Sequence, residues 1–381
     1  MFLTILAVIV VLSPIVIIHE FGHYIACRLT GIRVNEFAFG FGKILWHKKV
    51  GDTDYQIRAI PFGGFVEPAG QMFHPKDAKE GPKPYEFAAK RWYAKLFMVV
   101  NGALFNYLLA AVIFSALIYV KGMPETDPNK LPAVVGDVVA GYPAEKIGLK
   151  VQDEIIVING AQITNWQELT EAIAKREKDL NLTVKRNGEE LNLSAKAEDF
   201  LKDKPTLLGI SVSPTFKPVG FFSAAGLGVY QCYYWTKFSL DSLWQSFTKK
   251  KAPELAGPIG IVNIIHKSVR TGVLDFIFLI GMLSLAVGMF NLFPIPILDG
   301  GYAVVYLLEG LTGKLPTEKT VNAAANLGFY ILILLVAYAS YSDVKRIFFK
   351  PKAKVVQTQT VPADTPAQNA AETDLQNAEA N

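Results

Sequence analysis

Four long apolar stretches constrain the fold of this chain more than any other feature of its sequence. They cover residues 2–26, 96–120, 273–297 and 323–342. A helix needs about 20 consecutive apolar residues to cross the hydrocarbon core of a bilayer. Only 19% of the residues are charged and 51% are hydrophobic, whereas charged residues make up about a quarter of a typical soluble domain. The sequence therefore predicts a polytopic α-helical membrane protein with four transmembrane helices.

Two segments allow a different number of transmembrane helices. The first apolar stretch could be a signal peptide, but it lacks a basic start and a small-residue cleavage site, which favours a retained span. Residues 219–235 are uncharged and could form a fifth span. Their polar and glycine content, and the mixed sequence that follows, favour an amphipathic helix at the membrane surface.

The segments between the spans differ in composition. Residues 33–67 are β-rich and punctuated by glycine, which predicts a hairpin against the membrane. Residues 127–215 alternate short β-type runs with two helical patterns, and the Asn159-Gly160 and Asn187-Gly188 dipeptides predict tight turns. In chain order we expect a first transmembrane helix (1–30), a loop with the membrane-associated β-hairpin (31–95), a second transmembrane helix (96–122), one inserted α+β domain (127–215), an amphipathic surface segment (216–270), a third transmembrane helix (271–299), a loop with the fourth transmembrane helix (300–349) and a disordered tail (350–381).

Three ionisable side chains lie within the first apolar stretch, as His19, Glu20 and His23. Ionisable groups inside a membrane segment are costly and indicate function. The pattern H-E-x-x-H on a helix places both imidazoles on one face, where they can hold one zinc ion beside a glutamate that serves as general base. The alternative is a polar cluster that stabilises helix packing, and the ligand spacing with the adjacent glutamate favours the metal.

A catalytic zinc ion needs a third protein ligand and an open position for water. The other histidines, His47, His74 and His266, lie in loop or surface contexts, and Asp299 in NLFPIPILDGG is the better candidate. As an alternative, Asp-Gly-Gly is ordinary turn chemistry. With four spans, Asp299 emerges on the same side of the membrane as His19 and His23, whereas a fifth span at 219–235 would place it on the opposite side.

Taken together, these motifs resemble those of the bacterial site-2 proteases, the intramembrane zinc metalloproteases, and in particular the RseP type. The matching pieces are HEFGH, FGFGKILW, the IPFGGFV stretch, LAGPIGI at 255–261, NLFPIPILDGG, and a 127–215 module similar to a PDZ domain. The resemblance implies that His19, His23 and Asp299 bind Zn²⁺ and that Glu20 activates the metal-bound water. Well-known members carry two tandem PDZ domains, whereas this chain has room for one.

The resemblance also implies residues that bind substrate. Asn291, Pro294 and Pro296 match positions that help to hold substrate beside the metal, which suits an amide that can bond an unwound backbone and prolines that break a helix. Asn106 lies in NGALFN, which is similar to a Gly-Pro-x-x-Asn pattern except that Ala103 replaces the proline. An interhelical hydrogen bond is the alternative role for Asn106. The hairpin would offer an edge strand to the substrate.

The implied activity is cleavage of transmembrane segments in single-span membrane proteins, such as anti-sigma factors or remnant signal peptides. Membrane lipid and a peptide or protein ligand of the PDZ-like domain are further expected partners, and the net charge of +4 is too small to indicate nucleic acid. A secondary transporter would show inverted repeats, and none is found. A non-catalytic PDZ scaffold is disfavoured because all four chemical residues are present.

The expected location is the bacterial cytoplasmic (inner) membrane. The 27–95 loop holds 12 Lys/Arg against 7 Asp/Glu, which places it in the cytoplasm by the positive-inside rule. The active site then lies near the cytoplasmic side, and the PDZ-like domain is periplasmic or extracellular. Basic residues after the fourth span, from Lys345 to Lys354, favour the opposite orientation, but the first helix usually dominates.

Overall fold

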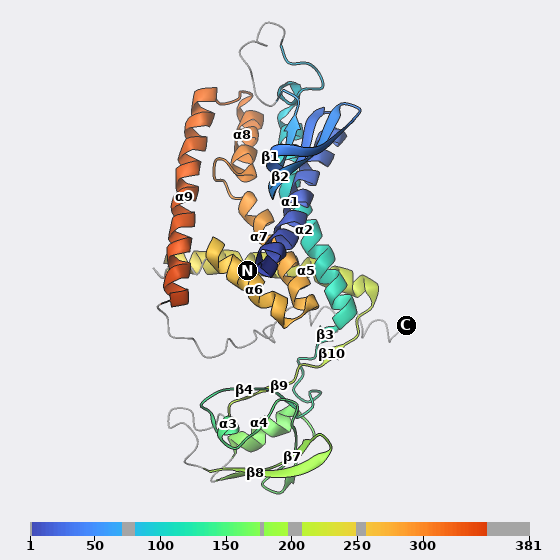
Figure 1. The fold of residues 1–381 in the computed structure, drawn as a ribbon, viewed down its shortest axis with the longest axis vertical. Coiled ribbons are helices and arrows are strands. Elements are labelled where there is room, and N and C mark those ends of the chain that lie inside the picture. The colour runs from blue at the N-terminus through green and yellow to red at the C-terminus, as the bar shows by residue number, and fades with distance from the viewer. Residues whose placement is uncertain (1, 71–80, 176–178, 197–207, 249–256, 349–381) are drawn as a thin grey trace. The chain divides into compact units, whose positions relative to one another are not determined.

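The computed structural model describes residues 2–70, 81–175, 179–196, 208–248 and 257–348. The chain divides into two compact units, one of Met1–Leu117 with Phe221–Phe349 and one whose described part lies within Ile118–Gly220. Figure 1 shows the helices and strands of the chain. The predicted disordered tail, 350–381, lies outside the described residues.

The first unit is built from long helices. Four helices of the described chain are long and apolar enough to cross a membrane, as predicted. The helix that contains most of 219–235, α5 (Phe221–Thr248), is not among them. The helices of this unit are α1 (Phe2–Thr30), η2 (Phe87–Ala89), α2 (Trp92–Lys121), α5 (Phe221–Thr248), α6 (Pro258–Thr271), α7 (Val273–Asn291), α8 (Asp299–Thr312) and α9 (Glu318–Phe348). The four candidate spans lie in α1, α2, α7 and α9.

Apolar packing fixes α1 among its neighbours. Val11 and Ile15 of α1 are fully buried against Ile265 of α6 and apolar residues of α7. Closer to its C-terminal end, α1 crosses α2 at very short distance, because a Cβ atom at Gly22 would collide with the carbonyl oxygen of Asn101. The predicted surface segment 216–270 also packs inside this unit, since Ile265 of α6 belongs to the first cluster and Cys232 of α5 is buried in a second one between α2 and α7.

The predicted β-hairpin is present as β1 (Val34–Val50) and β2 (Thr53–Pro68), paired antiparallel from Val50↔Thr53 to Val34↔Pro68. Both strands bend, so that Phe37 near the start of β1 has one partner in each half of β2, Tyr55 and Val66. A 2.7 Å hydrogen bond between the hydroxyl groups of Tyr24 and Tyr55 joins α1 to the hairpin.

The third apolar helix is shorter than the predicted segment 271–299. α7 ends at Asn291, and α8 begins at Asp299, where the loop at the start of the expected 300–349 segment was predicted. Pro294 and Pro296 lack the backbone N–H that a continuing helix requires, and their rings clash with the preceding turn. The chain therefore folds into a tight connection in which Leu298 N–H donates to Ile295 O at 3.1 Å.

Glycines allow α8 to begin directly on top of this connection. A Cβ atom at Gly300 would collide with Leu292 and Phe293, and one at Gly301 with Ile295. Ile297 has a φ of 88°, a left-handed conformation that is unusual for a β-branched residue. Gly300 and Gly301 are thus required by close backbone contact at the start of α8.

The second unit is a small α+β module with its own core. Its sheet has the order β6-β5-β7-β8, and β4 pairs with β9 and β3 with β10. The elements are β3 (Met123–Pro124), β4 (Val135–Val138), α3 (Pro143–Lys146), β5 (Glu154–Ile158), β6 (Ala161–Gln162), α4 (Trp166–Ala174), β7 (Leu180–Arg186), β8 (Glu189–Ala195), β9 (Ile210–Val212) and β10 (Phe216–Lys217). Both predicted Asn-Gly dipeptides form tight turns with positive φ at each residue, as type I′ turns require.

Candidate metal centre

The two histidines of α1 direct their Nε2 atoms to the same point. They are one helical turn apart, and the two Nε2 atoms lie 3.3 Å from each other. His23 Nδ1 lies 2.8 Å from the carbonyl oxygen of Met98 in α2. A carbonyl group can only accept a hydrogen bond, so His23 carries its proton on Nδ1. In the neutral ring Nε2 then presents a lone pair, which is the form that binds a metal ion.

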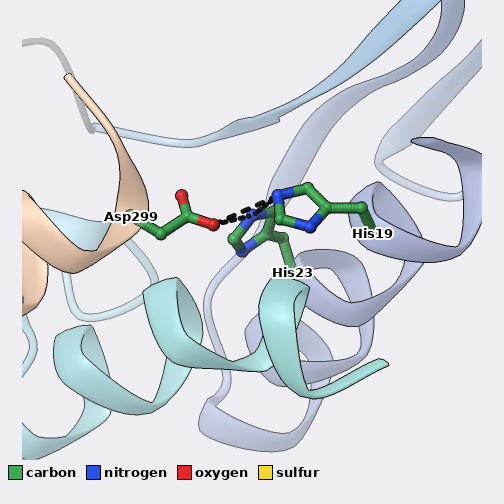
Figure 2. A group of neighbouring side chains, drawn as sticks. All are labelled: His19, His23 and Asp299. Carbon is green, nitrogen blue, oxygen red and sulfur yellow. Dashed lines mark hydrogen bonds and ion pairs between the residues drawn. The ribbon is translucent and has the colours of Figure 1, made fainter. Parts of the chain in front are cut away.

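Asp299 reaches the same point from the first residue of α8. Figure 2 shows its carboxylate pointing toward the two imidazole rings, and Oδ2 lies 3.1 Å from His19 Nε2 and 3.5 Å from His23 Nε2. The tight connection after α7 positions this carboxylate, because Asp299 directly follows the bend. Among the described residues, these three side chains form a group whose ligand atoms all lie within 4.8 Å of one another.

Space for the two rings is provided by a glycine on α2. A Cβ atom at Gly102 would collide with His23 Nε2 and would lie 2.6 Å from His23 Cε1 and 2.9 Å from His19 Cε1. Real Cβ contacts are essentially never that short. Gly102 thus lets α2 pass behind the ring atoms that would face a metal ion.

The donor set fits zinc. Two imidazole nitrogens and one carboxylate oxygen are a common zinc ligand set with one position left for water. The structure therefore brings together the three predicted ligands. Of the other histidines, His47 lies 3.2 Å from Asp54 on the hairpin and His266 lies 3.0 Å from Thr4 Oγ1, while His74 is outside the described residues.

Glu20 lies next to this group on α1. Its side chain is partly buried and close enough to His19, His23 and Asp299 to interact electrostatically with each. On its other side it faces β2, where a Cβ atom at Gly64 would lie 3.4 Å from Glu20 Cγ. Glu20 thus lies between the candidate ligands and the hairpin, where a general base could meet a substrate.

The predicted substrate residues lie in two different environments. Asn291 ends α7, Pro294 is exposed, and Pro296 lines an apolar cavity of about 40 Å³ together with Tyr302 and residues of α9. Asn106 is instead fully buried, and its Nδ2 lies 3.2 Å from His19 Nδ1. The predicted contact of Asn106 with substrate would require this region to open.

Several groups that shape the site were not predicted from the sequence. The Met98 carbonyl has no side-chain signature, because any residue supplies a backbone oxygen. Gly102 carried a usable signal, since small residues in a membrane helix often mark close helix packing. The ion pair of Lys95 with Glu309, at 2.9 Å, joins α2 to α8 and was not predicted.

Comparison with known proteins identifies the family. The model of peptidase family M50 matches residues 7–335. The chain belongs to this family. A relative from Rickettsia conorii is 32% identical over 91% of this chain and 99% of its own length. The Regulator of sigma-W protease RasP of Bacillus subtilis is 26% identical over 91% of this chain and 99% of its own length. The zinc metalloprotease RasP of Geobacillus kaustophilus is 26% identical over 91% of this chain and 98% of its own length.

Membership confirms the predicted enzyme class and cofactor. The chain is a zinc metalloprotease of the site-2 protease type. Its four long apolar helices and its RasP relatives identify it as a multi-pass membrane protein.

Proposed function

We propose that His19, His23 and Asp299 hold the zinc ion and that Glu20 is the general base for peptide hydrolysis within the membrane. The observation that carries this proposal is the convergence of the two histidine Nε2 atoms and Asp299 Oδ2 from separate helices, with Oδ2 3.1 Å from His19 Nε2. Zinc bound in such a site lowers the pKa of a coordinated water to about 7 and stabilises negative charge on the carbonyl oxygen.

Glu20 is the residue of this chain that moves protons in the proposed reaction. Its carboxylate takes a proton from the water whose oxygen attacks the scissile carbonyl carbon. It then returns that proton to the amine nitrogen as the C–N bond breaks. The position of Glu20 between the candidate ligands and β2 supports this role, because a substrate backbone beside β2 would pass next to the carboxylate.

We further propose that the substrate is a single-span membrane protein, such as an anti-sigma factor or a remnant signal peptide. A helix hides its peptide bonds, so the substrate segment has to unwind before cleavage. Residues 60–68 of β2 pair with β1 along one edge, and no described strand pairing covers their other edge. An unwound segment could add there as an extra strand. Asn291, Pro294 and Pro296, at the α7–α8 connection, would help to hold this segment.

The proposed location is the bacterial cytoplasmic membrane, with the active site near the cytoplasmic side. The contact of Asp299 with His19 supports a count of four spans, because both residues must lie at the same depth. The second unit would then fold on the periplasmic or extracellular side. We propose that it is a single PDZ-like domain that binds a peptide or protein ligand.

The test of the base is Glu20→Gln. We expect this full-length variant, purified in detergent, to retain zinc and to lose cleavage of a model single-span substrate, because it removes the base and leaves all three ligands. Removal of one general base typically costs about 10²- to 10⁴-fold in rate. Turnover equal to that of the unsubstituted protein would exclude Glu20 as the base.

A further inference from the structure

Asn106 lies at the back of the proposed metal centre. It is fully buried in α2, four residues after Gly102 and therefore on the same face of the helix. Its side-chain amide faces the Nδ1 atom of His19 at 3.2 Å, whereas His19 Nε2 points to Asp299. Asn106 thus touches the ring nitrogen that faces away from the site.

Contacts with α7 hold Asn106 in this position. The hydroxyl group of Ser284 donates to the Asn106 backbone carbonyl at 2.9 Å in a buried hydrogen bond. A Cβ atom at Gly288 would lie 3.2 Å from the Cβ atom of Asn106, so α7 packs closely against this residue. Because the Asn106 backbone is fixed between two helices, the remaining freedom of its amide is rotation of the side chain.

The two ends of the amide have different partners. Nδ2 faces His19, while Oδ1 is buried without a hydrogen-bond partner. A buried acceptor without a partner loses the hydrogen bonds that water would provide, so this arrangement is unfavourable. Half a turn of the amide exchanges the two ends and offers Oδ1 to His19 Nδ1, which must then carry the proton.

That exchange sets the tautomer that a metal ligand needs. A histidine that binds a metal through one nitrogen usually donates its other N–H to a carboxylate or carbonyl oxygen, which orients the ring. His23 already has such a partner in the Met98 carbonyl. His19 has no backbone carbonyl at its Nδ1 among the described hydrogen bonds, and the Asn106 amide occupies that position.

We propose that Asn106 is a positioning residue for zinc, whose Oδ1 accepts the Nδ1–H of His19 when His19 Nε2 binds the metal. The inference rests on the proposed metal site and extends it by one residue. It differs from the substrate-binding role expected from the sequence, because a fully buried side chain against His19 acts through the ligand.

The test measures zinc affinity, with no need for activity. Full-length Asn106→Leu, Asn106→Asp and Asn101→Leu variants are compared with the unsubstituted protein by competition with a chromophoric chelator. Leucine has a similar size and cannot accept a hydrogen bond, so we expect zinc binding to weaken roughly 10- to 100-fold. Aspartate keeps an accepting oxygen, so its affinity should stay within a few-fold of the unsubstituted protein. Asn101, also buried in α2, is the matched control and should leave the affinity unchanged.

A second comparison separates positioning from general damage to the fold. In excess chelator, the metal-free Asn106→Leu protein should unfold no more easily than the metal-free unsubstituted protein, because leucine removes a buried acceptor that has no partner. Unchanged affinity in Asn106→Leu, or equal losses in the Leu and Asp variants, would overturn the role of Oδ1 while leaving the proposed metal site intact. An unsubstituted protein that binds no zinc would overturn both.

Discussion

The Cα atom of Gly102 faces His19 and His23 where α1 and α2 cross, and the rings occupy the space that a side chain would need. At this scale the site depends on residues that leave room as well as on residues that bind. On α1, Gly22 leaves room in turn for the α2 backbone at the Asn101 carbonyl. The helix crossing and the ligand geometry are therefore set by the same pair of glycines.

Gly102→Ala is expected to lower zinc affinity by at least about tenfold, which corresponds to ~1.4 kcal/mol, because the new methyl group would displace the His23 ring. Zinc content after dialysis against a weak chelator is the measurement. Gly226→Ala in α5 is the matched control, since a Cβ atom at Gly226 would meet nothing within 4 Å. Equal zinc content in the two variants would show that the rings do not depend on this gap.

At the scale of elements, α8 carries Asp299 and is tied to α2 by a buried ion pair. Lys95 Nζ lies 2.9 Å from one Glu309 oxygen and 3.2 Å from the other. The Lys95 side chain is 2% exposed and that of Glu309 17%. Because a buried charge without its partner is strongly destabilising, this pair fixes one end of the helix whose other end provides the third ligand.

Glu309→Leu should destabilise the protein more than Lys95→Met, because it leaves the more deeply buried charge unpaired. The expected loss for Glu309→Leu is about 3–5 kcal/mol, and the double variant should recover much of it. Thermal unfolding in detergent measures both effects. Asp52→Ala, which removes the exposed partner of Arg33, should change stability by less than about 1 kcal/mol. A Glu309→Leu loss as small as that would contradict this account of α8.

The sequence predicted some elements much better than others. Span positions followed from apolar length, and the Asn-Gly turns followed from the conformational preference of those residues. The ends of α7 and α8 were not predicted, because whether the chain resumes a helix after Pro294 and Pro296 depends on the backbone contacts of Gly300 and Gly301.

In the candidate site, too, some residues were predicted from the sequence and others were not. His19, Glu20 and His23 were found from spacing along one helix, and Asp299 from the number of spans. An interhelical hydrogen bond was the alternative role considered for Asn106, but its partner His19 lies 87 positions away, and no local pattern predicts that partner. The Lys95–Glu309 pair spans 214 positions and required the packing of α2 against α8.

For the whole molecule, the proposed four-span topology would place the loops before α2 and after α8 on one side of the membrane and the second unit on the other. Cysteines at Lys83, Lys314 and Lys185, all exposed positions, test this in intact cells after Cys27 and Cys232 are changed to alanine. We expect the first two to resist a membrane-impermeant thiol reagent. The Lys185 position should react once the reagent has passed any outer membrane.

A fifth span would change one of these results. If α5 crossed the membrane, the cysteine at Lys314 would become reactive while those at Lys83 and Lys185 kept their behaviour. Asp299 would then lie across the membrane from His19 and His23, and a metal site of these three residues could not form.

The zinc content of the purified full-length protein, compared with that of Asp299→Ala and His47→Ala, decides whether Asp299 completes the metal site. Asp299 provides the ligand from outside α1, whereas the His47 side chain is 63% exposed on the hairpin and lies apart from the site. We predict stoichiometric zinc in the unsubstituted protein and in His47→Ala, and little zinc in Asp299→Ala. Stoichiometric zinc in Asp299→Ala would contradict the account, because the third ligand would then have to be another residue.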